Sequence, residues 1–151
     1  MAKFNVGIET AAEPQQVVDA LIDFSDGRPE IWPGLAREFY EVYSVGETSA
    51  EIREGSSKPV KVWARERYEW STPGVVRWEV LESNFCRPGS YVEVRVEPKQ
   101  GGGSHVDLEW NRTPSNAKGR VAVMIMKVAG PSILKSYMTK TLRRVADSAA
   151  S

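Results

Sequence analysis

Cysteine and histidine are almost absent from this sequence, and their scarcity excludes several kinds of site. The one cysteine, Cys86, permits no disulfide within the chain. One cysteine and one histidine cannot supply the three or four ligands of a Cys/His zinc site, and we expect no metal and no cofactor. A Ser-His-Asp or Cys-His catalytic apparatus would have to use His105, which follows GGGS at an expected strand start. We interpret it as a solvated residue beside a turn.

Long apolar runs and an excess of charge of one sign are also missing. No run of about 18 apolar residues is present, so we predict no stable membrane insertion. The N-terminal MAKFNVGIETAAEP lacks the apolar core of a signal peptide, which makes a cytoplasmic location the default expectation. Twenty basic and twenty acidic residues cancel, so no whole-chain charge would draw the protein to nucleic acid.

The chain is long enough for one domain with a sizeable core, and we expect a single domain over residues 1–151. Residues 3–10 alternate apolar and polar side chains, which predicts a strand. The following residues 11–27 have helical spacing of apolar side chains, with Pro14 in the first turn. Residues 27–36 are rich in glycine and proline and predict a short helical turn and a loop.

The second half of the pattern is a series of strands followed by a long helix. Turn residues separate the expected strands at 37–45, 48–55, 60–70, 75–83, 89–97 and 104–112. Apolar residues at helical spacing predict a helix from about 116 to 147, kinked or interrupted at Pro131. The short connections imply antiparallel neighbours.

Seven strands and one long helix predict an α+β fold. We expect a strongly curved seven-stranded antiparallel sheet wrapped around the C-terminal helix, with two short helices between the first and second strands. A curved sheet that grips a helix leaves a cavity between them.

Several local sequences have this same order in a known family. They are AAEPQQVVDAL after the opening strand, the Trp32-Pro33 pair, ERYEWSTPGVVRWEV, and a glycine-rich turn at 101–103 before the terminal helix. Together they resemble the START-like (SRPBCC) superfamily and its helix-grip fold over nearly the whole chain, and its polyketide cyclase/dehydrase-like branch most of all. The resemblance implies a small hydrophobic or aromatic ligand, lipid- or polyketide-like. Some members of this branch are aromatase/cyclases.

The stretch VWARERYEW, residues 62–70, carries charged and aromatic side chains on both of its alternating faces. Its face can be predicted from the neighbouring strand, where Trp78 belongs to an apolar face. A turn of two or four residues within STPG would pair Arg67 with Trp78 and direct the arginines to the cavity. A loop of three or five residues, or a bulge, would direct Glu66 and Tyr68 there instead. We favour the arginine face.

The resemblance favours the same face. In aromatase/cyclase relatives a strand arginine four residues after a tryptophan lies in the pocket, and Trp63 and Arg67 have that spacing. The pocket tyrosine of these relatives aligns with Phe39, so a phenol that could transfer a proton is missing at that position. An inward Arg67 would pair with Glu69 or bind a ligand carboxylate, enolate or carbonyl.

Aromatic walls with a polar anchor predict a binding site for a planar or lipid-like molecule. The predicted ligand-binding residues are Trp32, Phe39, Trp63, Arg65, Arg67, Trp78, Val94, Leu108, Trp110, Met124 and Val128. Plain core packing is the alternative role of the tryptophans. We predict binding without catalysis, in a monomer or homodimer, and assign no catalytic residue. The alternatives are an aromatase/cyclase or dehydratase-like enzyme using the same cavity, and a protein-interaction module.

The expected terminal helix is strongly basic. Such a helix could contact anionic lipid or RNA, but a solvated helix face is the commoner role and the one we predict. Its basic residues are Lys118, Arg120, Lys127, Lys135, Lys140, Arg143 and Arg144.

Overall fold

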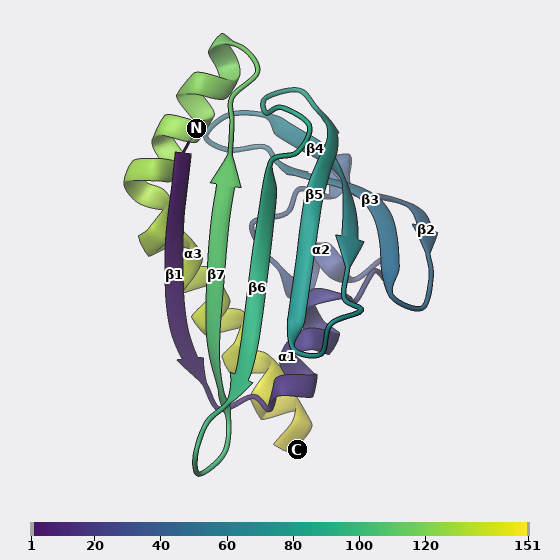
Figure 1. The fold of residues 1–151 in the computed structure, drawn as a ribbon, viewed down its shortest axis with the longest axis vertical. Coiled ribbons are helices and arrows are strands. Elements are labelled where there is room, and N and C mark those ends of the chain that lie inside the picture. The colour runs from purple at the N-terminus through teal and green to yellow at the C-terminus, as the bar shows by residue number, and fades with distance from the viewer. Residues whose placement is uncertain (1, 151) are drawn as a thin grey trace.

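Seven antiparallel strands form one open sheet in the order β1-β7-β6-β5-β4-β3-β2, as Figure 1 shows. The structure is a computed structural model and describes residues 2–150. Its strands are β1 (Ala2–Thr10), β2 (Glu41–Val45), β3 (Ser49–Ser56), β4 (Val62–Glu69), β5 (Val75–Ser83), β6 (Tyr91–Pro98) and β7 (Ser104–Arg112). Each pair of neighbours is antiparallel. The predicted α+β fold with a seven-stranded sheet is confirmed.

Two short helices connect the first two strands, also as predicted. They are α1 (Pro14–Leu21) and α2 (Arg28–Ile31), followed by a 3-10 turn, η1 (Arg37–Phe39). The predicted strand at residue 37 therefore begins late, because its first residues form η1 and only residues 41–45 pair with β3.

The long helix α3 (Ala117–Ala150) crosses one face of the sheet diagonally, beside β1 at its beginning (Figure 1). It continues through Pro131 without the predicted interruption. Within residues 2–150 it is the one helix that is long and apolar enough, by length and composition alone, to cross a membrane, although the sequence has no unbroken run of about 18 apolar residues. In this fold it is the helix that the sheet grips, with Met138 and Leu142 buried in the core.

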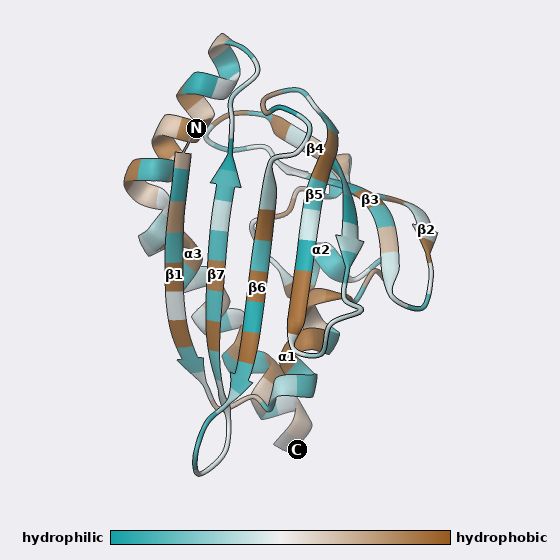
Figure 2. Ribbon diagram, in the orientation of Figure 1, coloured by the Kyte–Doolittle hydropathy of each residue, from teal (hydrophilic) through white to brown (hydrophobic). Residues whose placement is uncertain are grey.

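The core lies between the sheet and α3. Figure 2 shows apolar and polar residues alternating along the strands, as expected for a sheet with one buried face. The inward side chains of the central strands are fully or almost fully buried, and they include Val76, Val80, Val92, Val94, Val106 and Leu108. The candidate site lies on this face, because the buried face of the sheet continues across β4 and β3.

Gly119 allows α3 to begin in contact with the loop after β5. A Cβ atom at this position would lie 1.9 Å from the carbonyl oxygen of Phe85, a backbone atom that cannot easily move away. We expect Gly119→Ala to lower the free energy of unfolding by about 1–3 kcal/mol, measured by urea denaturation. Gly27→Ala is the control, since its Cβ would come no closer than 3.6 Å to a neighbour. Equal stability of the two variants would contradict the expectation.

Candidate functional site

The loop between β4 and β5 decides which face of β4 looks inward. Gly74 has a φ of 75°, and the N–H of Val75 donates to the carbonyl of Thr72 at 3.1 Å. Proline followed by a glycine with positive φ is the arrangement of a type II turn. The register places Tyr68 opposite Trp78, so an odd number of residues separates them. The even-numbered turn that we favoured would have placed Arg67 there.

The prediction that Arg65 and Arg67 face the cavity is therefore wrong. Arg65 pairs with Glu51 on the outer face and lies 4.1 Å from the centre of the Tyr43 ring. Arg67 is exposed, opposite Glu79. A one-residue difference in register moves every side chain of a strand to the other face. The structure has the alternative arrangement, in which Glu66 and Tyr68 face the cavity.

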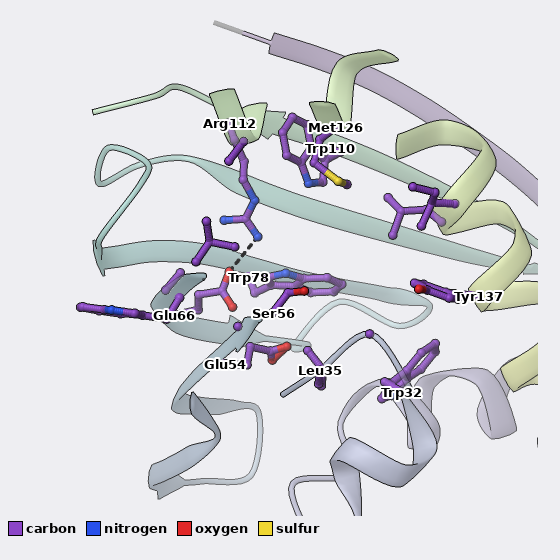
Figure 3. A pocket seen from close by; sticks show the side chains of 18 of the residues that line it. Trp32, Leu35, Glu54, Ser56, Glu66, Trp78, Trp110, Arg112, Met126 and Tyr137 are labelled. Atoms are coloured by element: carbon purple, nitrogen blue, oxygen red, sulfur yellow. Dashed lines mark hydrogen bonds and ion pairs between the residues drawn. The ribbon is translucent and has the colours of Figure 1, made fainter. Parts of the chain in front are cut away.

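Glu66 and Tyr68 are both 1% exposed and line a cavity of about 810 Å³ between the curved sheet and α3. The cavity wall is mainly apolar. It includes Leu21, Trp32, Leu35, Trp63, Ala64, Trp78, Phe85, Leu108, Trp110, Ala122, Met126, Leu134, Tyr137 and Met138. Figure 3 shows Trp78 and Trp110 projecting from the sheet. Trp32 and Tyr137 lie at the end of the cavity away from Glu66 and Arg112 (Figure 3).

Arg28 anchors the first of two polar clusters in this cavity. Its guanidinium donates to the carbonyl oxygens of Leu21 and Asp23 at 2.9 and 3.0 Å and to the hydroxyl of Tyr68 at 3.0 Å. The Tyr68 hydroxyl in turn donates to the Glu54 carboxylate, at 2.7 Å to Oε2, and Arg28 lies 3.6 Å from the same oxygen. Arg28 is 3% exposed, and its Nε is buried without a hydrogen-bond partner. The cluster fixes α2 against β3 and β4.

Glu66 and Arg112 form the second cluster. Arg112 Nη2 donates to Glu66 Oε2 at 3.1 Å, the bond drawn as a dashed line in Figure 3. Arg112 Nη1 lies 3.7 Å from the Cys86 sulfur. The two side chains come from β4 and β7, which are not neighbours in the sheet, and meet across its curved face. Their pair is a charged group in a mainly apolar wall.

Burial governs the protonation of these groups. It raises the pKa of Glu66 to about 7, although the nearby Arg112 charge acts in the opposite direction. Burial likewise raises the pKa of the Tyr68 phenol well above its ordinary value, with the Glu54 charge adding to the effect. For Arg112 burial lowers the pKa, but the attraction of Glu66 outweighs it and the pKa is raised. Glu66 can therefore gain or lose a proton near neutral pH.

The structure brings together five of the eleven predicted ligand-binding residues. Those that line the cavity are Trp32, Trp63, Trp78, Leu108 and Trp110. Val94 is fully buried in the core but does not line the cavity, and Phe39 lies in η1 outside it. Met124 and Val128 are 61% and 78% exposed, so their predicted inward direction is wrong. The first half of α3 has apolar residues on its exposed as well as its buried side. Ala122 and Val123 are the buried ones, and Ala122 and Met126 line the cavity.

Most of the charged groups of the cavity could not be predicted from the sequence. Glu66 and Tyr68 appeared only as the alternative face of β4. Arg28 follows Gly27 in a segment without periodicity, and no local signal marks it. Arg112 does have a signal, since it follows Trp110 by two residues on an alternating strand and therefore shares its face.

The described residues offer no set of ligands for a metal ion. Among residues 2–150, no group of three or more His, Cys, Asp and Glu side chains is placed to hold a metal ion. His105 lies at the surface end of β7, 3.2 Å from Asp107, and does not line the cavity.

Three solved structures share this fold along nearly the whole chain. The protein TTHA0849 from Thermus thermophilus is 18% identical with a TM-score of 0.78, and the match covers 99% of both chains. A START superfamily protein from Mycobacterium smegmatis is 10% identical with a TM-score of 0.73, over 98% of this chain and 99% of that one. The Zhui aromatase/cyclase of a Streptomyces species (R1128) is 16% identical with a TM-score of 0.65, over 96% and 87%.

Identities this low show the fold alone, and a helix-grip fold is what they share. No curated protein sequence matches the chain. The sequence model of one family, described as polyketide cyclase / dehydrase and lipid transport, matches residues 1–150. The chain therefore belongs to the polyketide cyclase / dehydrase and lipid transport family.

Proposed function

We propose that this protein binds one small hydrophobic or aromatic molecule in the cavity between the sheet and α3. The observation that carries the proposal is an apolar cavity of about 810 Å³ with four tryptophans in its wall and a buried charged pair at one side. Such volumes suit ligands of drug-like size, and a few convergent polar groups give orientation. The tryptophans Trp32, Trp63, Trp78 and Trp110 provide flat apolar area for an aromatic or lipid-like body.

The fluorescent probe N-phenyl-1-naphthylamine, which is neutral and apolar, tests this proposal. We expect saturable binding of one probe per chain, with quenching of tryptophan emission. Ala122→Phe should weaken this binding at least tenfold, because Ala122 lines the cavity and a phenyl ring would fill part of it. Ala117→Phe is the matched control on the exposed side of α3. Equal binding by both variants would place the probe outside the cavity and contradict the proposal.

A second candidate is an enzyme of the aromatase/cyclase or dehydratase type acting in the same cavity. Glu66 favours it, because a carboxyl group with a pKa of about 7 can donate or accept a proton near neutral pH. The cavity would contribute mainly by holding a reactive chain in a productive fold. Products from a poly-β-ketone substrate should then differ between wild type and Glu66→Gln. An unchanged product distribution would leave the binding proposal alone standing.

A further inference from the structure

The Glu66–Arg112 pair has fewer hydrogen-bond partners within the protein than the Arg28–Glu54 pair. Arg28 and Glu54 are linked through Tyr68, and Arg28 also holds two backbone carbonyls. Arg112 has only one bond to an oxygen in the described residues, at Glu66 Oε2, and one long contact to sulfur. A guanidinium has five N–H donors. The remaining donors of Arg112 are available to a molecule in the cavity that it lines.

Glu66 also keeps capacity for a further partner. Its Oε2 accepts from Arg112, while Oε1 has no donor among residues 2–150. The charged and titratable groups around it are Arg112 from β7, Glu54 from β3, Arg28 from α2 and Tyr68 from β4 itself, with Cys86 behind Arg112. Tyr137 is the one titratable side chain that α3 adds to the wall, and Lys58 comes from the β3–β4 connection.

Charge balance in this cavity depends on the proton of Glu66. With Glu66 ionised, the two buried arginines and the two glutamates compensate one another, while the charge of Lys58 is exposed to solvent. An added anion would then place two negative charges beside Arg112 in a site of low dielectric, which is costly. With Glu66 protonated, Arg112 is an uncompensated buried cation, and an anion beside it restores the balance. A carboxylate or sulfonate matches the guanidinium in geometry as well as in charge.

We infer that the cavity accepts amphiphiles with a monoanionic headgroup, a carboxylate or a sulfonate on an apolar body, and that the headgroup binds Arg112 while Glu66 takes up a proton. The inference rests on the proposed function, since it names the ligand class of the same cavity. Burial of Glu66, which raises its pKa to about 7, places the coupling in the neutral range. Neutral molecules of the same shape bind without proton uptake.

Two naphthyl probes with the same ring system separate headgroup charge from body shape. They are 1-anilinonaphthalene-8-sulfonate, the anion, and N-phenyl-1-naphthylamine, the neutral compound. Calorimetry of the wild-type protein at pH 7, in phosphate and in Tris, gives the protons taken up per probe bound. We expect about half a proton for the anion, because about half of the Glu66 carboxyls are already protonated there, and none for the neutral probe.

Affinity for the anion should fall with pH by up to about tenfold per unit above 7, while affinity for the neutral probe stays level. Glu66→Gln should abolish the proton uptake and bind the anion at least tenfold more tightly than wild type at pH 8.5. Glu79→Gln, an exposed change on β5, should behave as wild type. No proton uptake by wild type, or the same pH dependence in Glu66→Gln, would overturn the inference. If the neutral probe fails to bind, the proposed function fails first.

Discussion

Glu66→Gln is expected to stabilise the protein at pH 8 by roughly 3 kcal/mol. Burial raises the pKa of Glu66 to about 7 in the folded chain, from the ordinary glutamate value of 4.5 that applies to the unfolded chain. The folded state therefore holds the proton more tightly than the unfolded state does. Wild-type stability falls between about pH 4.5 and 7 as the unfolded chain loses this proton first, and it is level above 7. Glutamine does not titrate and escapes the loss.

Urea unfolding at pH 4.5 and pH 8, followed by tryptophan emission, measures the effect. The free energy of unfolding of the variant minus that of wild type should be about 3 kcal/mol larger at pH 8 than at pH 4.5. Glu79→Gln is the control and should show the same difference at both pH values. If the Glu66→Gln protein is clearly less stable than wild type at pH 8, the attraction between ionised Glu66 and Arg112 outweighs the cost of burying the Glu66 charge, and the expectation is wrong.

Arg28→Met should lower the free energy of unfolding by about 3–5 kcal/mol, because it removes one partner from a buried ion pair. The Glu54 side chain, only 11% exposed, would lose its cation. The carbonyl groups of Leu21 and Asp23 would lose their donor, and the Tyr68 hydroxyl would lose one of its partners. Methionine preserves most of the side-chain length, so the loss reports on charge and hydrogen bonds.

Arg37→Met is the matched control for this change. Arg37 also donates to a backbone carbonyl, that of Asp26, and pairs with a carboxylate, Glu30, but its side chain is 58% exposed. Its replacement should cost at most about 1 kcal/mol in the same urea experiment. Arg28→Lys should recover little stability, since an ammonium group lacks the planar fork that reaches several acceptors at once. Equal losses at the two arginines would refute the structural role of the buried cluster.

The order of elements could be predicted because its signals are local. Alternation over residues 3–10, Pro14 at a helix start and the glycine-rich turn at 101–103 each act within a few residues. The face of β4 could not be predicted in the same way. It depends on whether the turn that contains Gly74 holds an odd or an even number of residues, and both arrangements fit the sequence.

The candidate site was predicted in its apolar part and missed in its charged part. Trp78 and Trp110 each alternate in step with the apolar residues of their own strand, so they were assigned correctly to the inner face. Arg28 reaches the cavity from a segment between Gly27 and Pro29 whose path is set by tertiary contacts alone. In the first half of α3 apolar residues lie on the exposed side as well as the buried side, so Met124 and Val128 fitted the pattern as well as the true inward residues did.

The balanced composition of the chain conceals a separation of charge in space. All seven basic side chains of α3 are exposed, and Asp147 is the only acidic residue within the helix. Because the whole chain is neutral, the rest of it carries an acidic excess of six. The opposite charges of α3 and the rest of the chain give the protein an electric dipole that orients it in a field, although it has no net charge to pull it in either direction. At physiological salt this orientation acts only within about 8 Å of a charged surface.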